Sequence, residues 1–257
     1  MHKKLITGLL AAILLATFIT PGCFLFDSAV DEAIDNSHDE MANNMAAGMM
    51  VPMYKSYGLS LMAAYFWAGG YWLAHHPYQP GQWTKWSHQI EQASKSEGPE
   101  QPLHVEKAFL KRNADGSEWW RLKALGKGPD ETFVFEALFS AERTQIVRML
   151  AKMGDNPVTE ITFEEGEASF PAPSAFEDTW INDHTQGTVS LAAGTLSFSA
   201  NHVQFKTPDG AGQVDFYFSA DVPGGLIKYQ FSNTQGDKYS IQLSGHGSNA
   251  VSELGAF

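Results

Sequence analysis

Few residues of this sequence have the types and spacing that catalysis requires. A serine hydrolase needs a nucleophile on a sharp turn together with a histidine and a carboxylate, and the sequence contains no G-x-S-x-G motif. Asp183 and His184 are neighbours and His246 lies between two glycines, but adjacency in a sequence does not establish the geometry of a triad. We therefore predict that the protein is not an enzyme. A hydrolase that uses His184 or His246 beside a serine and a carboxylate stays as an alternative hypothesis.

Ligands for a metal or a nucleotide are not grouped in the sequence either. There is no H-E-x-x-H motif, and the adjacent His75 and His76 would point apart on a helix. Asn113, Asp115 and Ser117 have the spacing that begins a calcium-binding loop, but the later ligands of such a loop are missing. No glycine-rich phosphate-binding loop precedes a helix. The sequence thus predicts no metal site and no cofactor.

Aromatic side chains are the residues that could bind a ligand without catalysis. Five of them in strand-like runs are our candidates: Trp83, Trp86, Trp120, Phe135 and Phe216. On a concave surface they would bind a sugar or an acyl chain, and the alternative is that they fill the core of a β-rich domain. Burial of an acyl chain of roughly 14 to 16 carbons, at about 25 cal/mol per Å², would contribute several kcal/mol.

The N-terminus has the order of a secretory signal peptide. Lys3 and Lys4 precede an uncharged, mostly apolar run over residues 5–19, and the small residue Gly22 follows a turn-former. The apolar run is too short for a comfortable membrane span. We therefore predict that residues 1–22 are a leader that is removed on export.

Cys23, the only cysteine, directly follows this leader. The segment resembles the lipobox of bacterial lipoproteins, in which the cysteine is acylated and becomes the mature N-terminus. Gly22 fits that pattern, whereas Thr20 and Pro21 replace the usual residues. Two or three acyl chains, at about 0.8 kcal/mol per buried CH₂, make a stable anchor. Phe24 in place of aspartate implies, by the same resemblance, delivery to the outer membrane. An ordinary secreted protein with an unmodified cysteine is the alternative.

Length, charge and cysteine content exclude several classes of protein. A chain of 257 residues, 44% of them hydrophobic, can form one large core with an appendage and is not wholly disordered. Its net charge of −12 becomes −14 when Lys3 and Lys4 leave with the leader, so a phosphate backbone would repel it. A single cysteine permits neither an intramolecular disulfide nor a cysteine zinc cluster.

The region 23–79 is expected to be helical. Apolar residues follow one stripe over 28–50, which predicts a helix that Pro52 should stop or kink. Residues 56–74 then run for 19 positions without a charge, just the length of a membrane span. Three interpretations of this run stay open. It is a core helix packed on a sheet, a segment that enters the membrane beside the lipid anchor, or a helix for self-association.

From Trp83 onward the hydrophobic period is two. Phe133, Phe135, Ala137 and Phe139, for example, alternate with Val134, Glu136 and Leu138. Half-polar alternation favours antiparallel pairing with one wet face, and a sheet of ten or eleven strands should curl. Strand-like runs occur near 83–90, 103–111, 118–125, 132–139, 144–150, 158–163, 186–199, 201–207, 213–219, 226–232 and 238–244.

These patterns predict an α+β fold. Its main part is a large curved antiparallel sheet, an incomplete β-barrel, with N-terminal helices packed on or against it. We divide the chain into the signal peptide 1–22, an acylated cysteine with a helical apolar segment over 23–79, and a β-rich domain over 80–257. The proline-rich, acidic residues 164–180 predict a long loop, with a short helix near 176–181.

A set of short motifs in the β-rich region carries a resemblance to known proteins. They are PGQW at 80–83, GSEWW at 116–120, GDNP at 154–157, AGT at 193–195, VPGGLIK at 222–228 and LSGHG at 243–247. Their order resembles that of a diffuse group of uncharacterised bacterial lipoproteins, over residues 80–248. Such proteins are similar in outline to periplasmic lipoprotein carriers, whose curved sheet encloses an acyl-binding cavity closed by helices. The resemblance implies no catalytic residues.

The favoured function is that of a noncatalytic lipoprotein of the cell envelope. It would be anchored by Cys23 in the outer membrane, facing the periplasm or the cell surface, and would bind a lipid-like or other apolar ligand in a concave sheet. An alternative is a membrane-associated assembly factor that binds a partner through residues 56–74. The position of that segment, inside or outside the curve of the sheet, should distinguish the two.

Overall fold

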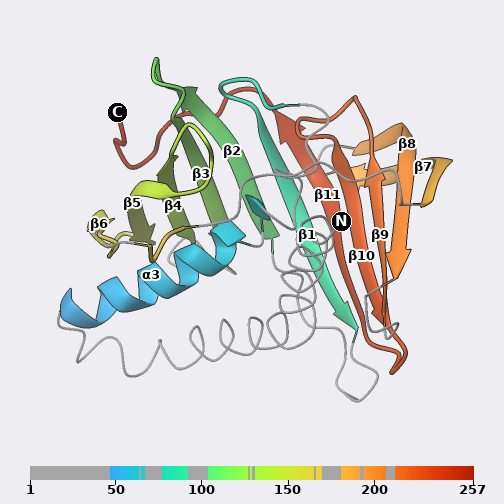
Figure 1. Ribbon diagram of the computed structural model, residues 1–257, viewed down its shortest axis with the longest axis horizontal. Helices are drawn as coiled ribbons and strands as arrows, with labels where there is room; N and C mark the ends of the chain where they lie inside the picture. Colours follow the sequence, from blue (N-terminus) through green and yellow to red (C-terminus); the bar gives the residue numbers. More distant parts are fainter. Residues whose placement is uncertain are drawn as a thin grey trace, which may run out of the picture.

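One antiparallel sheet of eleven strands forms most of the part of the chain that the structure describes (Figure 1). The structure is a computed structural model, and the strand order is β6-β5-β4-β3-β2-β1-β11-β10-β9-β8-β7. All pairs are antiparallel. The structure describes residues 47–63, 65–66, 77–91, 104–126, 128, 131–164, 166–169, 181–191, 194–206 and 212–257.

Most strands lie close to the runs of alternating residues. The bounds are β1 Trp83–Glu91, β2 His104–Arg112, β3 Glu118–Leu125, β4 Phe133–Phe139, β5 Ile146–Met153, β6 Thr159–Ile161, β7 Ile181–Leu191, β8 Gly194–Lys206, β9 Gly212–Phe218, β10 Leu226–Asn233 and β11 Lys238–Gly247.

Period-two alternation gives the sheet two different faces. On β3, Trp120 and Leu122 belong to the large apolar cluster, whereas Trp119 belongs to a second cluster on the opposite side. The large cluster includes residues from both halves of the sheet, such as Phe135 on β4 and Phe216 on β9. We call the face that carries this cluster the inner face, and the opposite one the outer face.

The sheet is curved and open. The edge strand β7 contacts β11, although β10, β9 and β8 lie between them in the strand order. The two edge strands, β6 and β7, do not pair with each other, so the sheet does not close into a barrel. The prediction of a large curved antiparallel sheet is confirmed, and one helix accompanies it in the described part of the chain.

Helix α3, Ala47–Ala63, packs on the inner face over β4, β5 and β6 (Figure 1). The Tyr57 and Phe133 rings meet edge to face, with centroids 4.8 Å apart. At Gly58 the helix comes so close that an added Cβ would lie 2.9 Å from Met149 and from Phe135. Residues 56–63 therefore form a core helix, as one of the three interpretations predicted. No helix among the described residues combines the length and apolarity needed to cross a bilayer.

Pro52 was predicted to stop or kink the helix, and it does not stop it, because it lies inside α3. A proline removes the bond from its own N–H to the carbonyl four residues earlier, which here is that of Gly48, in the first turn of the described helix. Only one backbone bond is lost there, and the Pro52 side chain is exposed. Burial of the following turns, which include Leu61 and Met62 at 0% exposure, outweighs this loss.

Other boundaries also differ from the predictions. The predicted run 186–199 is divided, because β7 ends at Leu191 and β8 begins at Gly194 as its antiparallel partner. Ile181 begins a strand rather than ending a helix. Of the helix predicted over 28–50, only 47–50 are described, and they are helical. The rest of that helix and most of the predicted 164–180 loop lie outside the described residues.

The C-terminal segment, residues 248–257, covers the outer face of β2 to β5. Leu254 and Ala256 pack with Leu110, Trp119 and Leu150. The buried carboxylate of Glu136 accepts hydrogen bonds from the hydroxyl of Ser252 and from the backbone N–H groups of residues 253 and 254. Alternation alone had predicted that the outer face of these strands is exposed to water, but the C-terminal segment covers it.

Candidate functional site

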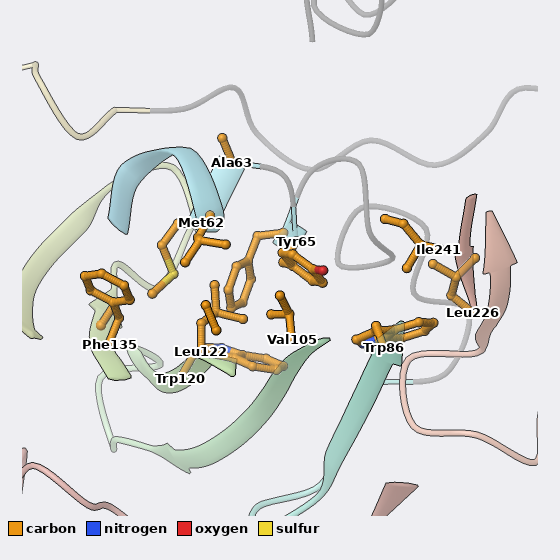
Figure 2. Close-up of a cluster of buried hydrophobic side chains, with 14 of the residues drawn as sticks. Met62, Ala63, Tyr65, Trp86, Val105, Trp120, Leu122, Phe135, Leu226 and Ile241 are labelled. Carbon is orange, nitrogen blue, oxygen red and sulfur yellow. The ribbon is translucent and has the colours of Figure 1, made fainter. Parts of the chain in front are cut away.

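Four of the five candidate aromatic residues lie on the inner face. Trp86, Trp120, Phe135 and Phe216 are exposed by 3% or less. Trp83 instead faces outward, where its indole N–H donates to the amide oxygen of Asn249 over 2.8 Å. The structure therefore brings Trp86 and Trp120 into one region (Figure 2) and places Phe135 under α3.

Tyr65 and Phe66, just beyond the end of α3, extend the cover of the inner face toward β1, β2 and β3. Phe66 meets the Trp120 ring edge to face with centroids 5.1 Å apart. Figure 2 shows Tyr65 between Trp120 and Trp86, above Val105. All of these side chains are buried. The described part of the charge-free run 56–74 thus lies inside the curve of the sheet.

A lysine is buried among these rings. The Lys107 amine donates to the backbone carbonyl of Tyr65 over 3.0 Å and lies 4.4 Å from the centroid of the Phe66 ring. The Tyr78 and Trp120 rings lie 5.3 and 5.2 Å from the same amine. Lys107 is 0% exposed. Cation–π contacts of this kind stabilise an ammonium group that has lost its water.

Burial lowers the pKa of Lys107 to about 7, the charge of Arg143 acts in the same direction, and Glu118 opposes both. The amine is therefore close to half protonated at neutral pH. A lysine with such a pKa can act as a nucleophile where a substrate reaches it. Because Tyr65, Phe66 and Tyr78 enclose the amine, its role in this conformation is to hold residue 65 to the sheet.

Glu118 is a buried carboxylate near this lysine. Its Oε1 accepts from Arg112 over 2.6 Å and from Arg143 over 3.1 Å, and its Oε2 accepts from the indole N–H of Trp120 over 3.0 Å. Arg143 has a φ of 60°, which costs strain for a side chain with a Cβ. The network fixes the Trp120 ring and ties the β4–β5 turn to β3.

A second polar group on the inner face joins β1 and β11. His88 Nδ1 lies 2.8 Å from the hydroxyl of Tyr239, and the His88 ring lies 5.4 Å from that of Tyr65. Burial lowers the pKa of His88 to about 3, with a smaller contribution from His104. The imidazole is therefore neutral. Within the part of the chain that the structure describes, neither His88 Nε2 nor the Tyr65 hydroxyl has a hydrogen-bond partner.

The outer face of β8 and β9 carries a histidine–carboxylate pair. His202 Nε2 lies 2.7 Å from Asp215 Oδ1, and Gln204 and Gln213 also donate to this carboxylate. Burial raises the pKa of Asp215, but these three hydrogen bonds outweigh it, so the net shift is downward. The His202 ring stacks on Tyr217 at 4.5 Å. Both carboxylate oxygens of Asp215 are thus occupied by hydrogen bonds to neighbouring side chains of the sheet.

The hydrolase hypothesis named two histidines. His246 is described, and it makes no hydrogen bond to a serine or a carboxylate among the described residues. The side chain of His184 lies outside what the structure describes. Among the described residues, no group of three potential metal ligands lies together.

Lys107, His88 and Tyr65 were not among the predicted site residues. A signal was present for two of them: Lys107 lies in phase with Val105 and Phe109, and His88 in phase with Trp86, so each occupies an inner-face position. A polar residue at an apolar phase of a strand indicates a buried polar group. Tyr65 carried no such signal, because its partners lie far away in the sequence.

Comparison with known proteins yields no close relative. No known protein family matches the sequence, and no curated protein matches it. A solved structure of a DUF1329 family protein from Desulfovibrio piger is similar over 68% of this chain and 87% of its own, with 10% identity and a TM-score of 0.31. A protein from Bacteroides fragilis with a YmcC-like fold, named as an exported protein, is similar over 66% of this chain and 97% of its own, with the same identity and TM-score.

Proposed function

We propose that this protein is a noncatalytic binding protein of the cell envelope, whose curved sheet takes up a lipid-like or other apolar ligand on its inner face. The observation that carries the proposal is the chemistry of that face. Trp86, Trp120, Phe135 and Phe216, on four different strands, belong to one apolar cluster enclosed by the curve of the sheet. Apolar burial alone would supply the free energy of binding.

Helix α3 would take part in ligand uptake. It lies on the inner face over β4 to β6, where Tyr57 contacts Phe133 and Phe135. An acyl chain that reaches these side chains has to displace at least part of the helix. Its close contact at Gly58 holds the closed arrangement. Binding would thus exchange helix–sheet contacts for ligand–sheet contacts, which makes the ligand and α3 competitors.

Export and anchoring complete the proposal. The leader 1–22 would direct the chain out of the cytoplasm, and acylated Cys23 would anchor it in the outer membrane. The net charge, −12 for the full sequence and −14 once Lys3 and Lys4 leave with the leader, argues against a nucleic-acid partner. Residues 1–46 lie outside the described part of the chain, so the sequence alone supports this part.

Fluorescence quenching by a brominated fatty-acid ester tests where a ligand binds. Bromine quenches only an indole that it touches, and the chain offers a matched pair: Trp120 faces inward, and its neighbour Trp119 faces outward. Two variants retain one of these indoles each, with phenylalanine at the other tryptophans. We expect saturable quenching of Trp120 and none of Trp119.

Circular dichroism would establish first that both single-tryptophan variants fold. Equal quenching of the two indoles would indicate adsorption to the surface. An absence of quenching at saturating ester, with native mass spectrometry showing no retained lipid, would contradict the proposed function.

A further inference from the structure

Two neighbouring polar atoms that are buried on the inner face have no hydrogen-bond partner among the described residues, and a third such atom, the Tyr54 hydroxyl, lies apart from them near Phe133. One is the hydroxyl oxygen of Tyr65, a residue exposed by 2%, and the other is Nε2 of His88, exposed by 8%. Their rings are 5.4 Å apart. In Figure 2 the Tyr65 hydroxyl points to the side on which Trp86 and Ile241 lie. The two atoms come from separate elements, β1 and the segment after α3.

The rest of each side chain is anchored. His88 Nδ1 is paired with the Tyr239 hydroxyl, and the backbone carbonyl of Tyr65 accepts from Lys107. The orphan atoms are therefore held in place by bonds at the other end of the same residues. Leaving a buried donor or acceptor unpaired costs free energy, and phenylalanine at position 65 would avoid this cost. Such an arrangement is expected where a ligand supplies the missing partner.

We propose that the Tyr65 hydroxyl and His88 Nε2 together bind one neutral polar group of the apolar ligand, an ester or amide carbonyl or a hydroxyl. The ligand is then a neutral acylated molecule, such as an acyl ester, and not the anion of a free fatty acid. This inference rests on the proposed function and specifies the chemistry of its ligand.

The surroundings of the pair favour a neutral group, because the buried amine that contacts Tyr65, that of Lys107, already donates to the backbone carbonyl of Tyr65. The Trp86 and Ile241 side chains are apolar and buried, so a carboxylate placed among them would lose its hydration. The same burial keeps His88 uncharged, with a pKa of about 3, so it offers no positive charge to an anion. The Tyr65 hydroxyl can donate to a carbonyl in either tautomer of His88. When Tyr239 donates to Nδ1, Nε2–H becomes a second donor.

Binding to the full chain tests the inference with three probes of equal chain length: monopalmitoylglycerol, palmitate and hexadecane. Each would be measured by displacement of an apolar fluorescent dye. We expect the ester to bind at least tenfold more tightly than palmitate. Tyr65→Phe should weaken ester binding about tenfold, leave hexadecane binding unchanged, and leave the unfolding midpoint of the ligand-free protein unchanged or higher.

Tyr54→Phe is the matched control, because Tyr54 is a buried tyrosine of α3 that lies near Phe133 instead of His88. Its binding of all three probes should match that of the wild type. Unchanged ester affinity in Tyr65→Phe would overturn the inference. So would a lower unfolding midpoint without ligand, since the hydroxyl would then have a partner, such as a bound water, within the fold. If none of the probes binds to the wild type, the proposed function itself fails.

Discussion

Lys107 is a basic residue at an inward-facing position of β2, where the alternation of the strand predicts an apolar residue. Val105 and Phe109, two residues away on either side, belong to the inner cluster. An ammonium at 0% exposure loses its hydration, and the carbonyl of Tyr65 and three aromatic rings replace only part of it. This imbalance is the reason that burial lowers the pKa of Lys107 to about 7.

Replacement of Lys107 by methionine should make stability less dependent on pH. Between the folded pKa of about 7 and the reference value of 10.5, the unfolded chain holds a proton that the folded chain has released, so this group makes stability rise with pH. The free energy of unfolding of Lys107→Met should therefore exceed that of the wild type by more at pH 6 than at pH 10. The excess should be smaller by about 4 kcal/mol at pH 10, at 1.36 kcal/mol per pKa unit. Urea unfolding at each pH measures it.

Lys111→Met provides the control for this prediction. Lys111 lies on the same strand but is exposed. The difference between its free energy of unfolding and that of the wild type should be the same at pH 6 and at pH 10. If Lys107→Met and Lys111→Met show equal pH profiles, the Lys107 amine is hydrated in solution and the buried arrangement is wrong.

Two elements without strand pairing cover the two faces of β4 and β5. Helix α3 lies on the inner face, with its Gly58 backbone close to Phe135 and Met149. The segment 248–257 lies on the outer face, held by Glu136. Both contacts are side-chain contacts over a long sequence separation. Each therefore depends on one small or one charged residue at the point of closest approach.

Gly58→Val should separate α3 from the sheet. The new Cβ would meet Phe135 and Met149 at 2.9 Å, and overpacking of this size costs about 1–3 kcal/mol. Ser56→Val, at an exposed position of the same helix, should change the free energy of unfolding by less than about 0.5 kcal/mol. Thermal unfolding followed by circular dichroism measures both. Equal stability of the two variants would show that the helix does not approach the sheet at Gly58.

Glu136→Ala should release the C-terminal segment. The change removes the acceptor for Ser252 and for the part-buried N–H of Glu253, and it leaves the backbone N–H of Leu254 buried without this partner, at a cost of about 2–4 kcal/mol. Hydrogen exchange in residues 248–257 should become much faster. Glu142→Ala, at an exposed turn position, should leave exchange unchanged. Unchanged protection in Glu136→Ala would mean that the other contacts of the segment, such as the bond from Arg121 to the carbonyl of Val251, hold it without Glu136.

At the scale of the whole molecule, a curved open sheet encloses one apolar interior. The inner cluster combines side chains from nearly every strand, from β6 to β9, with those of α3. A sheet of this size bends because each strand is twisted relative to the next. In the described residues α3 lies in this interior, where the proposed ligand would have to compete with it. The anchor predicted at Cys23 would keep this interior close to a membrane.

Cys23 should carry acyl chains in the mature protein. Growth of an expressing bacterium with radiolabelled palmitate should label the wild type and leave a Cys23→Ser variant unlabelled, because the chain has no other cysteine. After membrane fractionation, the wild type should be found in the membrane pellet and the Cys23→Ser variant in the soluble fraction. A wild-type product without label would contradict the anchor and leave an ordinary secreted protein.

Local sequence patterns determined the strands and their faces. β3 was predicted over 118–125 and has those bounds, with Trp120 facing inward and Trp119 outward. Such patterns depend on neighbours one and two positions apart, so they can be read directly. They could not show that Trp83 contacts Asn249, or that helix and tail cover opposite faces of β4, because those contacts join distant parts of the chain.

The sequence also determined that the interior is apolar, but not which side chains meet there. It indicated an apolar inner face and an uncharged segment at 56–74 as separate features. Only the tertiary structure placed Tyr65 and Phe66 on that face, enclosed Lys107 between them and Trp120, and set the Tyr65 ring beside His88. The physical reason is that alternation decides which way a side chain points, whereas the curvature of the sheet decides which distant side chains it meets.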